Sequence, residues 1–173
     1  DITSGSVSHV GIAMTFGLIV MAMIYTFGSV SGAHINPAVT IAFSLTDRFD
    51  KKDLFGYIIA QLIGAFLASG VLKILFTTHE NLGATFPYGD WHQTFILEII
   101  LTYFLMLVII FASQNKAIQQ FTGMAVGATV LLEAMFAGPI TGASMNPARS
   151  IAPAIVSGNI TELWIYIAAP IIG

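Results

Sequence analysis

The chain has 173 residues, of which 56% are hydrophobic and 9% are charged, and its mean hydropathy is +0.85. Soluble domains contain about 25% charged residues, so this composition indicates a membrane protein. Cysteine is absent, which excludes a disulfide framework and thiol chemistry. A formal net charge of −3 without a basic cluster argues against a nucleic-acid partner.

Apolar segments predict four membrane-spanning helices, because a helix needs about 20 mostly apolar residues to cross the hydrocarbon core of a bilayer. A fifth apolar segment begins another span near the end of the sequence, and polar loops separate all of them. The predicted spans are residues 10–27, 54–76, 94–112 and 121–137, the last segment is 163–172, and the longer loops are 47–53, 77–92 and 113–120.

Basic residues predict the orientation of these spans. Arg48, Lys51 and Lys52 lie in one loop and Lys116 in another, and counting the spans places both loops on the same side. Cytoplasmic loops carry an excess of Lys and Arg, so these two loops are predicted to be cytoplasmic in a multi-pass protein of the cell membrane.

One stretch of the sequence occurs twice. Residues 31–45 read SGAHINPAVTIAFSL, and residues 141–155 read TGASMNPARSIAPAI, at an offset of 110 residues. In each copy Asn is a good helix N-cap and the following Pro suits the first helical position. The apolar run that follows is about ten residues, or about 15 Å of helix, which crosses about half of the core. Paired short helices in an internal repeat indicate a binding or permeation site near the bilayer midplane.

The twin motifs Asn36-Pro37-Ala38 and Asn146-Pro147-Ala148, with the surrounding SGAHINPAVT and AGPITGASMNPARS and the ending WIYIAAPIIG, resemble the major intrinsic protein family of aquaporins and aquaglyceroporins. Within it, the sequence is most similar to the nodulin-26-like intrinsic proteins and their prokaryotic relatives. The resemblance implies an all-α membrane fold, an inverted repeat of six transmembrane helices plus two re-entrant half-helices.

A single channel domain is then expected over residues 1–173. Its first repeat half is about 1–76, the linking loop is 77–92 and the second half is about 93–173. Compared with this pattern, and with its own repeat, the numbered chain is expected to lack the first span and the end of the last.

The repeat loses its symmetry where Val39 corresponds to Arg149. An Arg within an apolar membrane segment is costly and by default functional. The resemblance places Arg149 at the narrowest constriction, on the extracellular side, and spacing from the two Asn carries the other constriction positions to Phe16, Ala134 and Ala143. We call these four the filter residues.

The filter departs from the water-specific pattern, which has His where Ala134 stands, so the aperture is expected to be wider and more apolar. Ser150 stands where glycerol facilitators typically have Asp. The solute class therefore stays open between water with small uncharged hydroxylated solutes, such as glycerol or silicic, boric or arsenous acid, and water alone.

Three polar residues are expected near the re-entrant loops. Glu98 matches a family position that accepts N–H groups from a re-entrant loop, with solute contact as the alternative. His34 is expected to form hydrogen bonds within its loop rather than to sense pH. Glu133, whose position commonly holds Asn in relatives, adjoins Ala134 and is interpreted as a buried acceptor, with a gating role as the alternative.

The resemblance implies a passive channel that excludes protons and ions. The positive ends of two half-helix dipoles would meet at the midplane, and the amides of Asn36 and Asn146 would face the solute. No cofactor and no metal site are expected, and the partners are water, neutral solutes, the lipid bilayer and further copies in a homotetramer.

Other classes of membrane protein are weaker interpretations. No Walker-type loop supports a primary pump, and a secondary transporter would more often show acidic groups beside the helix break. An intramembrane enzyme needs a nucleophile with a base and an orienting group, which Ser31, Ser144 and His34 do not provide. A gated or purely structural family member with little flux remains an alternative.

Overall fold

The computed structural model describes residues 5–173, so the first four residues of the expected first repeat half lie outside the described part. Every regular element in residues 5–173 is a helix. In chain order they are α1 (His9–Ser31), α2 (Pro37–Leu45), the 3-10 turn η1 (Lys51–Asp53), α3 (Leu54–Leu75), α4 (Trp91–Gln114), η2 (Gln119–Phe121), α5 (Thr122–Thr141), α6 (Pro147–Ser157) and α7 (Leu163–Ile172).

Four of these helices are long and apolar enough to cross a membrane, namely α1, α3 with its preceding turn, α4 and α5. The predicted spans are confirmed, and α4 starts three residues before the predicted residue 94. Asp90 caps α4 by accepting from His92 N at 3.0 Å, so the helix begins outside the apolar run. A helix end depends on its cap as well as on hydropathy.

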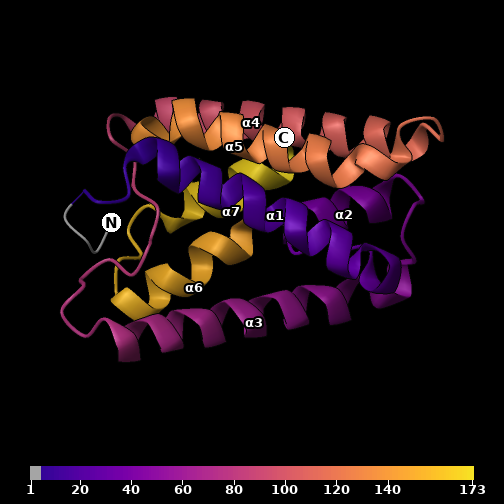
Figure 1. Cartoon of the computed structure of the whole chain (residues 1–173). Coiled ribbons are helices and arrows are strands. Elements are labelled where there is room, and N and C mark those ends of the chain that lie inside the picture. The colour runs from indigo at the N-terminus through magenta and orange to yellow at the C-terminus, as the bar shows by residue number, and fades with distance from the viewer. Residues whose placement is uncertain (1–4) are drawn as a thin grey trace.

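The most extensive contact between two helices is that of α1 with α5, which lie side by side in Figure 1. Helix α4 contacts both α5 and α7, while α3 lies on the opposite side against α6. Gly17 on α1 and Gly127 on α5 allow the closest approach, because a Cβ on Gly17 would overlap Gly127 O and a Cβ on Gly127 would lie 2.7 Å from Gly17 O. The two glycines are separated by the offset of the repeat, 110 residues.

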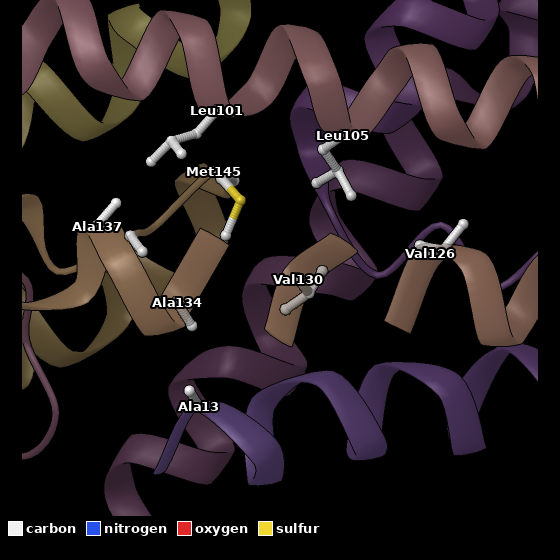
Figure 2. Close-up of a cluster of buried hydrophobic side chains, with 9 residues drawn as sticks. Ala13, Leu101, Leu105, Val126, Val130, Ala134, Ala137 and Met145 are labelled. Carbon is white, nitrogen blue, oxygen red and sulfur yellow. The ribbon is translucent and has the colours of Figure 1, made fainter. Parts of the chain in front are cut away.

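A cluster of buried, mostly small side chains joins α1, α4 and α5 to the second re-entrant loop (Figure 2). Interfaces between membrane helices favour small residues, because packing rather than the hydrophobic effect holds the helices together. The cluster contains Ala13, Leu101, Leu105, Val126, Val130, Ala134, Ala137, Ala143 and Met145.

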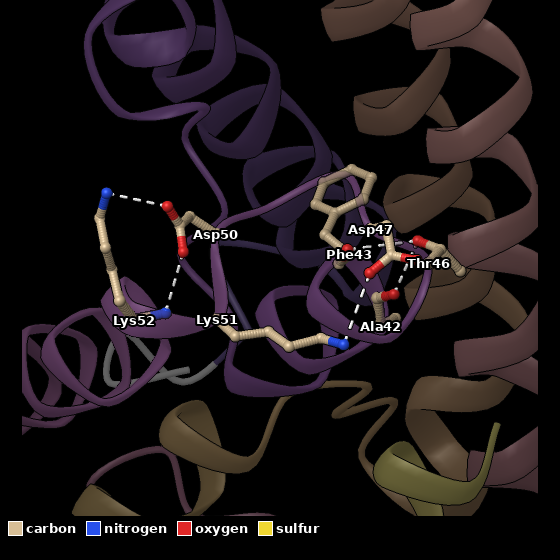
Figure 3. Close-up of polar contacts among 7 residues, drawn as sticks. All are labelled: Ala42, Phe43, Thr46, Asp47, Asp50, Lys51 and Lys52. Atoms are coloured by element: carbon tan, nitrogen blue, oxygen red, sulfur yellow. Dashed lines mark hydrogen bonds and ion pairs between the residues drawn. The ribbon is translucent and has the colours of Figure 1, made fainter.

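The loop between α2 and α3 and the loop between α4 and α5 lie at the same end of the molecule, as the span count predicts (Figure 1). In the first of these loops Lys51 Nζ lies 3.5 Å from Asp47 Oδ1, and Lys52 Nζ lies 2.8 Å from Asp50 Oδ2 (Figure 3). These ion pairs are exposed, so each contributes little to stability. Four of the six basic residues, Arg48, Lys51, Lys52 and Lys116, lie in these two loops.

Candidate functional site

The half-helices α2 and α6 start at the twin motifs. Asn36 Oδ1 accepts from Ala38 N at 2.9 Å, and Asn146 Oδ1 accepts from Ala148 N at 3.0 Å and from Arg149 N at 3.3 Å. Each amide oxygen thus satisfies N–H groups that a helix start leaves without partners.

The side-chain amides of the two Asn residues also join the repeat halves. Asn36 Nδ2 donates to Met145 O at 2.7 Å, and Asn146 Nδ2 donates to Ile35 O at 3.0 Å. An amide N–H₂ has two donors, so each Asn retains one N–H beyond this contact. Both Asn residues line a cavity of about 230 Å³, which we call the central cavity. Each amide was expected to offer its N–H₂ to the solute, and one of these two donors is instead used to join the repeat halves.

The repeat extends to backbone conformation. Three equivalent residues in each re-entrant loop adopt left-handed φ values, and only one of the three is glycine. The pairs are Gly32 and Gly142 (73° and 85°), Ala33 and Ala143 (47° and 42°), and Ile35 and Met145 (42° and 53°). Non-glycine residues avoid this region unless the surroundings hold them there. Both loops are therefore held in place by contacts outside themselves.

Glu98 on α4 provides such contacts for the second loop. Its carboxylate is fully buried and accepts from Thr141 Oγ1 at 2.7 Å, from Ser144 N at 2.9 Å and from Met145 N at 2.8 Å. In residues 5–173 no carboxylate is recorded as accepting from the equivalent N–H groups of the first loop, those of His34 and Ile35.

The four filter residues line the same central cavity as Asn36 and Asn146. The Arg149 guanidinium carbon lies 5.2 Å from the centre of the Phe16 ring, within the range of a cation–π contact. Ala134 and Ala143, which are 8% and 7% exposed, form the small walls. Most of the remaining lining is apolar, with Val20, Ile24, Val39, Leu105, Val126 and Val130, and His34 and Ser144 are among the polar residues that line the same cavity.

The loop before α4 reaches the filter, which the sequence did not indicate. Arg149 Nη1 donates to Gly83 O at 2.6 Å, and Thr85 Oγ1 lies 2.8 Å from Ser150 Oγ. Arg149 Nε has no hydrogen-bond partner among the described residues. A bond to a main-chain carbonyl depends on no particular side chain at the acceptor residue, so the sequence carries no signal for this contact.

The two remaining predicted residues lie in different surroundings. His34 Nδ1 is 3.2 Å from Thr40 Oγ1, and its ring lies 4.9 Å from that of Phe43 and 5.4 Å from that of Tyr57. Glu133 is 5% exposed and is not among the residues that line the central cavity. Its Oε2 has no donor among the described residues, so the structure records burial of this carboxyl without the expected hydrogen bond to that oxygen.

Comparison of the sequence with models of known protein families identifies the family of this chain. The family model described as "Major intrinsic protein" matches residues 2–173. The chain belongs to the major intrinsic protein family. Members of this family are channels rather than enzymes, and the chain is accordingly a multi-pass membrane protein with the family's helical fold.

Similar family members include nodulin-26-like proteins, as the motifs predicted. The chain is 48% identical over 172 residues to "Aquaporin NIP1-1" of Zea mays, covering 98% of this chain and 61% of the relative. It is 48% identical over 165 residues to "Nodulin-26" of Glycine max, covering 94% and 61%. The chain thus spans about three fifths of the length of these relatives.

Among solved structures, the chain is similar to the "aquaglyceroporin from Plasmodium falciparum". The TM-score is 0.86 and the identity 26%, with 96% of this chain and 78% of that chain covered. This likeness confirms the predicted aquaporin-type helical fold.

Proposed function

We propose that this protein is a passive channel for water and small uncharged hydroxylated solutes that excludes protons and other ions. The observation that carries the proposal is the single cavity that joins Phe16, Ala134, Ala143 and Arg149 to Asn36 and Asn146. Glycerol and the metalloid acids, such as boric acid, are the solute classes intended.

The electrostatics of this cavity favour neutral solutes with oxygen lone pairs. The N-termini of α2 and α6 meet at the two Asn residues and carry partial positive charge. Arg149 adds a full positive charge at the filter. A cation would lose its hydration there without receiving acceptors, whereas a hydroxyl oxygen accepts from the Asn amides and the guanidinium.

The shape of the filter favours more than water alone. Ala134 and Ala143 have no side chain beyond Cβ, and Phe16 provides one bulky apolar wall. Glycerol presents hydroxyls along one edge and C–H groups along the other, which matches a lining that combines Arg149 with apolar side chains. The relative from Plasmodium falciparum is described as an aquaglyceroporin, in agreement with this class. A water-selective channel is the second candidate.

Assembly and orientation belong to the same proposal. We propose a homotetramer with one channel in each subunit, in a lipid bilayer. On α3 only Ser69 is buried, and large apolar side chains such as Phe55, Leu67 and Ile74 are 75%, 66% and 77% exposed, which leaves them for lipid or a neighbouring subunit. The loops with Arg48, Lys51, Lys52 and Lys116 are proposed to face the cytoplasm.

The test is stopped-flow light scattering of proteoliposomes that contain the full-length protein, first under an osmotic step and then under inward gradients of glycerol and of boric acid. Fast water flux with solute entry is expected. Ala134→His should abolish solute entry and retain water flux, because the imidazole fills the aperture. Met124→His introduces the same residue at an exposed position near the start of α5, outside the cavity lining, and should change neither flux.

The outcomes separate the candidates. Water flux without solute entry in the unchanged protein would establish the water-selective channel. If neither water nor solute passes, the protein is instead a gated or structural member of the family.

A further inference from the structure

Helix α5 contains a main-chain carbonyl that its own helix does not satisfy. In a regular helix the N–H of residue 139 would donate to the carbonyl of residue 135. Residue 139 is Pro, which has no N–H, so Met135 O lacks its usual donor. Main-chain carbonyls that lose their helical donor are commonly satisfied by a side chain or by water.

His9, the first residue of α1, fills that position. His9 Nε2 lies 2.7 Å from Met135 O. A carbonyl oxygen only accepts, so Nε2 carries the proton and donates. The imidazole thus replaces the N–H that Pro139 lacks, although the two residues that meet are 126 positions apart.

Gly138 provides the space for this imidazole. A Cβ on Gly138 would lie 2.9 Å from His9 Cε1, closer than real Cβ contacts. The neighbouring residues Gly138 and Pro139 therefore provide both the room and the free acceptor for one side chain of α1. Two independent features of α5 fit the same ring.

The bond joins α1, which carries Phe16, to α5, which carries Ala134. His9, Ile12 and Phe16 lie at i, i+3 and i+7 on one face of α1, and with Ala143 and Arg149 they line an outer cavity of about 410 Å³. On the other side of the bond, Met135 follows Ala134 directly. The His9–Met135 contact therefore spans the filter from α1 to α5.

We infer that His9 is a positioning residue for the filter, which sets the separation of Phe16 from Ala134 and Ala143 by donating to Met135 O. The inference rests on the proposed channel function. The last turn of α5 has a second tie, from Tyr88 N to Ile140 O at 2.9 Å, which leaves the turn ordered when His9 is replaced.

The test compares glycerol and water permeability of the full-length protein in the same proteoliposomes. His9→Leu removes the donor and keeps an apolar body of similar size, and the ratio of glycerol to water permeability should fall by about fivefold, the factor that corresponds to one net hydrogen bond. Glycerol is larger than water, so under the proposed function its permeability should depend more strongly on the width of the aperture. A folding defect would lower both fluxes together and leave the ratio unchanged.

Two restorations distinguish the bond from the imidazole itself. His9→Gln keeps an N–H donor, and the ratio should return toward that of the unchanged protein. Pro139→Ala in the His9→Leu background gives residue 139 an N–H for Met135 O, and should also restore the ratio. His92→Leu is the matched control, because His92 is exposed, bonds Asp90 and lines neither cavity.

A conducting protein whose ratio is unaffected by His9→Leu, or whose loss is restored by neither change, would overturn the inference while the channel stands. No flux through the unchanged protein would overturn the proposed function and, with it, this role for His9. Should His9→Leu fail to fold, His9→Gln and the double variant must fold and keep the ratio; their failure also overturns the inference.

Discussion

The side-chain amide of Asn36 donates to the main-chain oxygen of Met145 at 2.7 Å, while the N–H of that same Met145 donates to Glu98 at 2.8 Å. One residue of the second re-entrant loop is therefore held from both sides, by the first motif and by α4. Because Met145 precedes Asn146 directly, Glu98 indirectly fixes where the two half-helices meet.

Glu98→Gln should lower the free energy of unfolding in detergent by about 2–3 kcal/mol, since an amide NH₂ would then face an N–H that the carboxylate now accepts. Glu133→Gln is the matched control. Both carboxyls are buried, but Glu133 Oε2 has no donor among the described residues, so the control should cost less than about 1 kcal/mol. Equal losses in a denaturant titration would contradict the role of Glu98 in holding the loop.

Gly17→Ala should destabilise the protein by about 1–3 kcal/mol, because the added Cβ overlaps Gly127 O and must push α1 away from α5. Gly56→Ala on α3 is the comparison. A Cβ there meets nothing within 4 Å, so the higher helix propensity of Ala should leave stability unchanged or raise it. Thermal unfolding of both variants in one detergent checks this, and a neutral Gly17→Ala would refute the close approach.

Arg149→Leu should raise cation leak into liposomes by about tenfold or more, which corresponds to a barrier lower by about 1.4 kcal/mol. The substitution removes the full positive charge of the filter and its bond to Gly83 O. Lys73→Leu removes a charge whose Nζ bonds Val156 O, outside both cavities, and should leave the leak unchanged. A pH-sensitive dye inside the liposomes reports the proton component. An unchanged leak in Arg149→Leu would assign cation exclusion to the half-helices alone.

Asp90 predicts a small acid sensitivity at the start of α4. The backbone N–H and the ring of His92 lower the pKa of the Asp90 carboxyl from its ordinary value near 3.8. A carboxyl with a depressed folded-state pKa stabilises the folded state above its unfolded pKa, and that contribution disappears as the pH falls through about 4 and below. Asp90→Asn should therefore match the wild type in acid and have a lower Tm near neutral pH. Parallel Tm curves for the two proteins at all pH values would contradict this.

Features that depend on neighbouring residues could be predicted from the sequence. The spans follow from runs of apolar residues, and the starts of α2 and α6 follow from Asn-Pro pairs whose capping involves only the next few residues. The twin motifs also indicated where a site would form, because a repeat at an offset of 110 residues implies two equivalent elements.

Contacts to main-chain atoms far along the chain could not be predicted in this way. The partners of Arg149 and His9 are the carbonyl oxygens of Gly83 and Met135, and any residue type can supply a carbonyl. The bond from Asn36 Nδ2 likewise depends on where Met145 O lies.

The sequence by itself determined the family, the spans and the residues of the two motifs, because helix capping and hydropathy depend on side chains that are close together in the sequence. The tertiary structure alone decided which atoms hold Arg149, Asn36 and His9, because those bonds form only when segments distant in sequence bring a donor and a main-chain oxygen within 3 Å.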